Sequence, residues 1–196
     1  MRREPLREAP PALLFFGVIT GFEALFSRAK ELIVKQFGPL HHRGESAAFP
    51  FPQTRTYARS MGPSLLRKFF VLATPWPQDG LAEVKHVALS MEKQIEAGGS
   101  FPVERPVNID PGLINDCRII LASTKDYAHR LYRGKGIWEE ITLFFEKGEY
   151  RTLPWTYPDF RSPAYHAFFE AFREELLSHA KSGQWPAPPP PAPPSP

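Results

Sequence analysis

Residues 12–20 have the sequence ALLFFGVIT, in which Leu13–Ile19 form an unbroken apolar run. Such a run is typical of a β-strand that is buried on both faces, because strands with one wet face alternate apolar and polar residues. Gly21 interrupts the run, and apolar residues then recur at three- and four-residue steps from Phe22 to Phe37, ahead of Gly38. This spacing predicts an amphipathic helix directly after the buried strand.

A second strand and a second helix are predicted farther along the chain. Lys68–Thr74 (KFFVLAT) has the composition of a strand, and apolar residues keep helical spacing over Leu81–Ile95. Asp79 precedes this helix and is a residue type that can cap a helix N-terminus. Residues 47–57 (AAFPFPQTRTY) lie between the first helix and the second strand. They predict broken extended chain, since their prolines cannot donate to a central ladder.

The second half of the chain changes from helical spacing to short β-type runs. These runs predict an antiparallel meander of hairpins that is followed by a last helix from Ser162 or Pro163. We therefore predict an α+β fold with a βαββαβ-like core, a mixed or antiparallel sheet, a C-terminal β-meander and a final helix. The runs are Pro106–Ile109, Arg118–Ala122, His129–Arg133, Ile137–Phe145 and Tyr150–Leu153, and the expected turns are Pro111-Gly112, Gly134-Lys135-Gly136 and Lys147-Gly148.

The 196 residues contain 23 prolines, many of them at the two ends. We expect a single domain over residues 12–181, a disordered extension over 1–11 and a disordered proline-rich tail over 182–196. The tail sequence WPAPPPPAPPSP cannot form a packed core and favours solvated polyproline II, which could offer PxxP motifs to a partner.

Charge and cysteine content restrict the class of protein. A formal net charge of +3 permits nucleic-acid or phosphate binding without predicting it. The single cysteine, Cys117, excludes an internal disulfide framework and suits a reducing compartment. Glu4 and Glu8 interrupt the basic start, and the apolar run after it is too short for a membrane span. We expect a soluble, cytoplasmic protein without a membrane partner.

The stretch CRIILASTKDYAHRLYRGKGIWEE, residues 117–140, mixes cations with aromatic rings. Cations attract phosphate and rings stack on bases, so this composition suits a nucleotide, another small anionic ligand or a single-stranded nucleic acid. An ordinary solvated hairpin tip is the alternative. Together with the aromatic loop at 154–160, the candidate ligand-binding residues are Lys125, His129, Arg130, Lys135, Trp138, Glu140, Trp155, Tyr157 and Asp159.

Strand alternation adds an expectation about three of these side chains. Arg130 and Glu140 could share a face and form a cross-strand ion pair, which would contribute about 0.2–1 kcal/mol. His129 would then lie on the opposite, apolar face as a structural histidine. The aromatic loop PWTYPDF, with Trp155, Tyr157 and Phe160, is expected to cover the sheet as part of the core, with the wall of a pocket as the alternative.

Carboxylates give a second chemical hypothesis. Asp110, Glu140 and Asp159 could converge on Mg²⁺, which prefers oxygen ligands, in a metal-dependent hydrolase or transferase. Against this, Asp110-Pro111-Gly112 is typical of a plain turn. The His41-His42 pair is expected in an exposed loop, and Cys117 has no evident histidine partner for nucleophilic catalysis. No sequence motif indicates a particular cofactor.

The strings VNIDPGLI, LASTKDYAHRLYRGKGIWEEITL and LPWTYPDFRSPAY together resemble a bacterial and archaeal family, domain of unknown function family 4416. The resemblance spans about residues 12–180 and includes FPF at 49–51 and the pair Met61-Gly62. The family has no established activity, although its members are often labelled "GTP-binding protein". The resemblance therefore implies a label, but no mechanism.

The residues of this chain do not supply the usual chemistry behind that label. A P-loop requires GxxxxGK[ST], and Gly134-Lys135-Gly136 is followed by Ile137 instead. Where the family carries an acidic DYYExEMG segment, this chain has RTYARSMG at residues 55–62, with Arg55, Ala58 and Ser60 in place of acids. Binding of a phosphate-bearing ligand or nucleotide at the basic and aromatic residues is therefore the leading hypothesis. The alternatives are a non-enzymatic protein-interaction module and the metal-dependent enzyme.

Overall fold

The computed structural model describes residues 6, 9–10, 12–52 and 55–182. The disordered extension predicted for residues 1–11 lies mostly outside these ranges. The disordered tail predicted for 182–196 also lies outside them, apart from Ser182, which ends the last helix.

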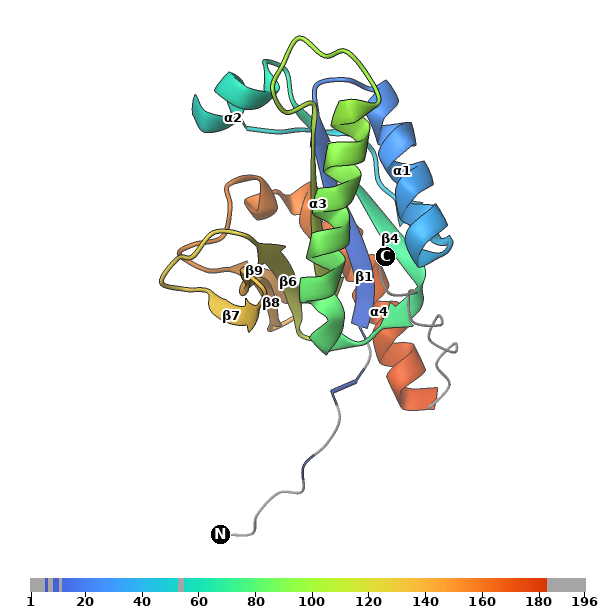
Figure 1. The fold of residues 1–196 in the computed structure, drawn as a ribbon. Helices are drawn as coiled ribbons and strands as arrows, with labels where there is room; N and C mark the ends of the chain where they lie inside the picture. Colours follow the sequence, from blue (N-terminus) through green and yellow to red (C-terminus); the bar gives the residue numbers. More distant parts are fainter. Residues whose placement is uncertain (1–5, 7–8, 11, 53–54, 183–196) are drawn as a thin grey trace.

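One antiparallel sheet organises the described chain (Figure 1). Its strand order is β2-β4-β1-β5-β6-β8-β7, while β3 pairs with β4 and β9 pairs with β8. The predicted α+β class is thus confirmed, with all strand pairs antiparallel. The strands are β1 Ala12–Thr20, β2 Leu40–Glu45, β3 Phe49–Pro50, β4 Leu66–Trp76, β5 Val107–Ile114, β6 Arg118–Ser123, β7 Leu131–Gly134, β8 Ile137–Glu146 and β9 Glu149–Thr152.

Helices cover both faces of this sheet. On one face lie α1 (Ala24–Phe37) and α3 (Leu81–Ala97), and on the other lies α4 (Pro163–Ser182), as Figure 1 shows. Strand β1 lies between β4 and β5, and every one of its residues is buried, as the apolar run predicted. Leu14 and Phe16 contribute to the core under α1 and α3, whereas Leu13 and Phe15 contribute to the core under α4.

The predicted turn at Pro111-Gly112 is wrong, because both residues lie inside β5. Pairing between β5 and β6 begins only at Gly112, so the missing N–H of Pro111 costs no hydrogen bond to β6. The real turn follows at Asn115, whose Oδ1 accepts hydrogen bonds from the N–H groups of Cys117 (3.0 Å) and Arg118 (2.8 Å). The turn is therefore stabilised by the side chain of Asn115 and is not formed by Pro111-Gly112.

Three further local predictions are corrected. The broken extended chain predicted for residues 47–57 is present in its first part, where the short strand β3 lies, but its last residues begin a short helix, α2 (Arg55–Met61). Asp79 does not cap the second helix, since a 3₁₀ turn, η1 (Gln78–Gly80), precedes α3 without a side-chain cap. His41 is buried on β2, with its Nε2 3.0 Å from Oε1 of Glu175 on α4, and is not in an exposed loop.

Other predicted features are confirmed. The turns at Gly134-Lys135-Gly136 and Lys147-Gly148 consist of residues with positive φ, as tight hairpins require. The last helix begins at Pro163. Within the described ranges, no helix is both long enough and apolar enough to cross a membrane.

Gly112 provides a test of the close contact between β5 and its neighbours. A Cβ at this position would lie 2.6 Å from Cε1 of Phe15 and against the carbonyl oxygen of Ile120. Since neither the sheet backbone nor a buried ring can easily move, we expect Gly112→Ala to lower the free energy of unfolding by about 1–3 kcal/mol. Urea denaturation followed by circular dichroism measures this change.

The matched control is Gly98→Ala at the C-terminal end of α3, where φ is −84° and the nearest atom to a Cβ is 3.2 Å away. We expect this change to stay within about 0.5 kcal/mol. Equal stability of the two variants would contradict the close packing described at Gly112.

Candidate functional site

A cavity opens where β5 and β6 separate. Strand β5 pairs with β1 over Val107–Ile114, but with β6 only over Gly112–Ile114. The unpaired part of β5 and the end of β6 enclose a space of about 80 Å³ between them. Side chains from α2, α3, β8, the loop before β5 and the loops after β6 and β9 complete its wall.

Helix α3 supplies the hydrogen bonds that β6 does not make. Lys85 Nζ donates to the carbonyl oxygen of Ile109 (3.0 Å), and the N–H of Ile109 donates to Oε1 of Glu92 (2.7 Å). Lys85 and Glu92 are seven residues apart, so they lie on the same side of the helix, two turns from each other. Both side chains are buried, and together they provide hydrogen-bond partners for the backbone C=O and N–H of Ile109, which β6 does not pair with.

Asp110 is held as a fixed anion at the wall of the cavity. Its Oδ1 lies 2.9 Å from Lys85 Nζ, and its Oδ2 accepts a hydrogen bond from Asn108 Nδ2 (2.6 Å). Burial by itself raises the pKa of Asp110, but the positive charges of Lys85 and Arg67 and these hydrogen bonds outweigh it and lower the pKa to about 2. Asp110 is therefore ionised at neutral pH and has no proton to donate.

The positive charge of Arg67, on β4, lowers the pKa of Asp110, although the central strand β1 lies between β4 and β5. Gly17 on β1 pairs with Asp110 on one side and with Phe69 of β4 on the other. A Cβ at Gly17 would lie 3.5 Å from Nη1 of Arg67, so the guanidinium occupies the space that a larger side chain would take. The absence of a side chain at Gly17 thus lets the positive charge of Arg67 approach the cavity.

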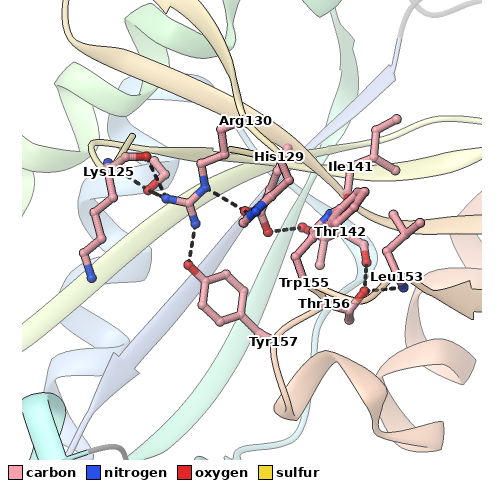
Figure 2. Close-up of polar contacts among 11 residues, drawn as sticks. Lys125, His129, Arg130, Ile141, Thr142, Leu153, Trp155, Thr156 and Tyr157 are labelled. Carbon is pink, nitrogen blue, oxygen red and sulfur yellow. Dashed lines mark hydrogen bonds and ion pairs between the residues drawn. The ribbon is translucent and has the colours of Figure 1, made fainter. Parts of the chain in front are cut away.

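Arg130 organises the opposite wall, as Figure 2 shows. Its Nε donates to Oε2 of Glu140 (2.7 Å), its Nη1 to Oγ of Ser123 (2.8 Å) and to the carbonyl oxygen of Lys125 (2.8 Å), and its Nη2 to the hydroxyl of Tyr157 (2.7 Å). All three guanidinium nitrogens are engaged, and the side chain is 1% exposed. This arginine connects the end of β6, strand β8 and the loop after β9.

The loop after β9 is positioned by a gap along the edge of β8. Strand β7 covers Ile137–Glu139 and β9 covers Leu143–Glu146, which leaves the residues between them unpaired on that edge. Trp155 Nε1 donates to the carbonyl oxygen of Ile141 (2.9 Å), and Thr156 Oγ1 donates to that of Thr142 (2.6 Å) (Figure 2). These bonds bring Tyr157 to Arg130.

The expected ion pair of Arg130 and Glu140 is present, although Arg130 lies in the turn before β7 and not on a paired strand, and His129 does not lie on the opposite face. His129 Nε2 is 3.0 Å from the same Oε2 of Glu140 that Arg130 contacts, and its ring stacks on Trp155 at 5.1 Å. Strand alternation fails because β7 begins at Leu131, so both residues lie in the preceding turn. Of the two alternatives for the aromatic loop, core burial holds for Phe160, which is fully buried, but not for Trp155 and Tyr157, which are each 37% exposed. Tyr157 lines the cavity instead.

The structure brings some of the predicted residues together and separates others. Lys125, Arg130, Glu140, Tyr157 and Asp110 line the cavity. His129 and Trp155 lie next to it, behind Glu140, where they contact each other and the edge of β8.

Three predicted residues lie elsewhere. Lys135 is at the β7–β8 hairpin tip, 3.2 Å from Oε1 of Glu83, and Trp138 packs against Tyr132 at 5.1 Å. Asp159 lies in the 3₁₀ turn η2 (Asp159–Arg161) and faces Arg67, so it does not join Asp110 and Glu140. Among the described residues, no group of three or more His, Cys, Asp or Glu side chains could hold a metal ion.

Sequence reasoning missed the residues that α3 and β5 contribute. Lys85 and Glu92 lie within the buried stripe of α3, together with Leu81, Ala88 and Ile95. Two charges at helical spacing within an apolar stripe were the available indication of a buried polar site. Arg105, which bonds to Glu92 (3.1 Å) and to Asn108, had no comparable pattern.

Comparison with known proteins assigns the family. The model of a domain of unknown function, DUF4416, matches residues 10–176. The chain therefore belongs to the DUF4416 family, as its motifs indicated. No curated protein and no solved structure matches it significantly.

The separate position of Asp159 leads to a prediction about stability. Arg67 Nε and Asp159 Oδ2 are 3.1 Å apart with side chains only 5% and 3% exposed, and the guanidinium faces the rings of Phe51 and Phe160. Because Arg67→Met would leave a buried carboxylate unpaired, we expect it to lower the free energy of unfolding by about 3–5 kcal/mol. The double variant Arg67→Met/Asp159→Leu should lose less, as measured by urea denaturation.

The matched control for that pair is the exposed ion pair of Arg151 and Glu149. Arg151→Met should change stability by less than about 1 kcal/mol. A double variant no more stable than Arg67→Met alone would show that the unpaired charge is not the cause of the loss.

The lowered pKa of Asp110 predicts a pH dependence of stability. Ionised Asp110 stabilises the fold fully above the unfolded pKa of 3.8, and this contribution of about 2 kcal/mol is lost as pH falls from about 4 to about 2. The stability difference between the native chain and Asp110→Asn should therefore shrink over this interval. Removing the positive partner with Lys85→Met should flatten the profile, and an unchanged profile in Lys85→Met would contradict the assignment.

Proposed function

We propose that the cavity between β5 and β6 binds the phosphoryl group of a small ligand or nucleotide. One observation carries this proposal: four cationic side chains face two carboxylates around the space. Glu92, which is not part of the lining, pairs with Arg105, so one positive charge remains in excess and favours an anion. The cations are Lys85, Arg105, Lys125 and Arg130, and the carboxylates are Asp110 and Glu140.

Lys125 is the cation best placed to meet the ligand. Lys85, Arg105 and Arg130 are each bound to carboxylates of the chain. Within the described part of the chain, the ammonium of Lys125 has no ion pair, and Figure 2 shows it extending away from the Arg130 network. The hydroxyl of Ser123 lies in the same wall, so a phosphoryl oxygen between the two would receive one charged and one neutral hydrogen bond.

The size of the cavity limits what it accepts. At about 80 Å³ it is far smaller than the roughly 300–1,000 Å³ of pockets that enclose a whole small molecule. We infer that only the phosphoryl group enters, while the rest of the ligand stays at the mouth beside the exposed ring of Tyr157. A nucleobase could stack there, since aromatic rings bind bases of any sequence.

This mode differs from that of a P-loop, because it relies on side-chain cations and not on backbone N–H groups. The metal-dependent enzyme has less support, since Asp159 faces Arg67 instead of Asp110 and Glu140. The single cysteine supports a cytoplasmic setting for this binding.

Calorimetric and thermal-shift titrations test the proposal with inorganic phosphate, pyrophosphate, ribose 5-phosphate, GMP and GTP. A ligand at 100 times its Kd should stabilise the protein by about 2.7 kcal/mol. Lys125→Met should weaken binding about tenfold or more, because it removes the unpaired cation while leaving the Arg130 network intact.

The matched control is Lys147→Met in the β8–β9 turn, which does not line the cavity. It keeps the same change in net charge, so equal weakening by both variants would indicate a nonspecific charge effect and contradict the site. Absence of any stabilisation by all five ligands would contradict the proposal as a whole.

A further inference from the structure

Two exposed tyrosine rings contact the guanidinium of Arg130 beside the cavity. The guanidinium lies over the ring of Tyr127 at 4.6 Å, and its Nη2 donates to the hydroxyl of Tyr157 at 2.7 Å (Figure 2). Tyr127 is 51% exposed and Tyr157 is 37% exposed. Six of the seven exposed large apolar side chains in the described ranges lie between residues 127 and 157. The two rings thus belong to a concentration of apolar surface, which is typical of a binding site.

Hydrogen bonds position both rings before a ligand arrives. The N–H of Arg130 donates to the carbonyl oxygen of Tyr127 (2.9 Å), which closes the turn before β7. Thr156 Oγ1 donates to the carbonyl oxygen of Thr142 (2.6 Å), which holds the residue next to Tyr157 against β8. Rings that are already in position lower the entropy cost of binding.

Arg130 connects these rings to the residues that we assign to the phosphoryl group. Its Nη1 donates to Oγ of Ser123 and to the carbonyl oxygen of Lys125, each at 2.8 Å. One side chain therefore contacts both tyrosines and both residues of the phosphoryl site. A cation and a hydroxyl next to exposed rings match a nucleotide, because cations attract its phosphate and rings stack on its base. A phosphorylated sugar without a base would leave the rings uncovered.

The charges of the site favour a ligand with a single phosphoryl group. One positive charge is in excess around the cavity, whereas a phosphomonoester carries about −1.5 to −2 at neutral pH. Asp110 in the wall is ionised, since its pKa is about 2, so a second or third phosphoryl group would meet a negative charge. The cations of the β7–β8 hairpin do not offset this charge, because Arg133 is paired with Glu139 (3.2 Å) and Lys135 with Glu83 (3.2 Å).

The same ion pairs argue against a single-stranded nucleic acid. Phosphate contacts along the strand dominate the affinity of such a ligand, so it needs a row of unpaired cations. Within the described part of the chain, Lys125 is the one cation of the cavity wall that has no ion pair. The site therefore suits a small molecule.

We propose that the ligand of this site is a nucleoside monophosphate. Its phosphoryl group lies at Ser123 and Lys125, and its base stacks on the exposed rings of Tyr127 and Tyr157. Because stacking needs only the flat face of a base, the site accepts purines and pyrimidines. This inference rests on the proposed function, since it names the ligand of the same cavity, and it adds that the corresponding triphosphate binds more weakly.

Isothermal titration calorimetry of the full chain with AMP, ATP and ribose 5-phosphate tests the proposal, in buffer without divalent cations. Ribose 5-phosphate has the sugar and the phosphoryl group of AMP without the base. Stacking predicts that AMP binds roughly 5- to 150-fold more tightly than ribose 5-phosphate. ATP should bind at least about tenfold more weakly than AMP, because its additional negative charges face Asp110.

Tyr157→Leu and Tyr127→Leu remove the rings, and the ratio of the two affinities measures what the rings contribute. Each change should reduce the preference for AMP over ribose 5-phosphate about threefold or more, and the double variant should bind the two ligands about equally. Tyr157→Phe keeps the ring and should keep the preference. A general loss of structure at Arg130 would weaken both ligands alike, so it would not change the ratio.

The matched control is Tyr132→Leu, an exposed tyrosine whose ring packs on Trp138 (5.1 Å) at the β7–β8 hairpin. It should leave the preference unchanged. Equal affinity of the native chain for AMP and ribose 5-phosphate would overturn the assignment to a nucleotide and leave the phosphoryl site in place. Tighter binding of ATP than of AMP would overturn the restriction to one phosphoryl group. If neither AMP nor inorganic phosphate binds, the proposed function fails and this inference fails with it.

Discussion

The backbone N–H and C=O of Ile109 must be hydrogen-bonded, although β6 does not pair with this part of β5. The site depends on which groups provide these hydrogen bonds. An unpaired buried N–H or C=O costs as much as a lost hydrogen bond. Lys85 and Glu92 supply the two partners from α3. Burying Lys85 then requires an anion close to it, which Asp110 provides. A polar cavity in the middle of an apolar sheet follows from this one separation of strands.

On the opposite wall of the cavity, Arg130 is another buried polar side chain whose hydrogen bonds are all supplied by the fold. Arg130 is almost fully buried, and it is tolerated there because each of its nitrogens donates a hydrogen bond. Those bonds fix the relative positions of β6, β8 and the loop that carries Trp155 and Tyr157. The cavity and the exposed rings are therefore parts of one connected arrangement.

Much of the fold could be predicted from local patterns, and the errors share a cause. β1, α1, α4 and the two glycine hairpins have patterns of burial or backbone geometry that local sequence encodes. Pro111-Gly112 and the pair of His129 and Arg130 were misplaced because the departure of β6 and the start of β7 depend on neighbouring strands. Four of the nine candidate ligand-binding residues line the cavity, whereas Lys85 and Asn108 could not be assigned without the packing of α3 on β5.

By itself, the sequence determined the family, the α+β class and the central buried strand, since periodicity, turn residues and motif order are properties of neighbours in the chain. Only the tertiary structure decided which charges meet. Asp110 and Asp159 look alike along the chain, but one faces Lys85 in the cavity and the other faces Arg67 beneath α4. The reason is physical: a buried charge takes the partner that folding places within a few ångströms, and that partner lies 25 residues away for Asp110 and 92 for Asp159.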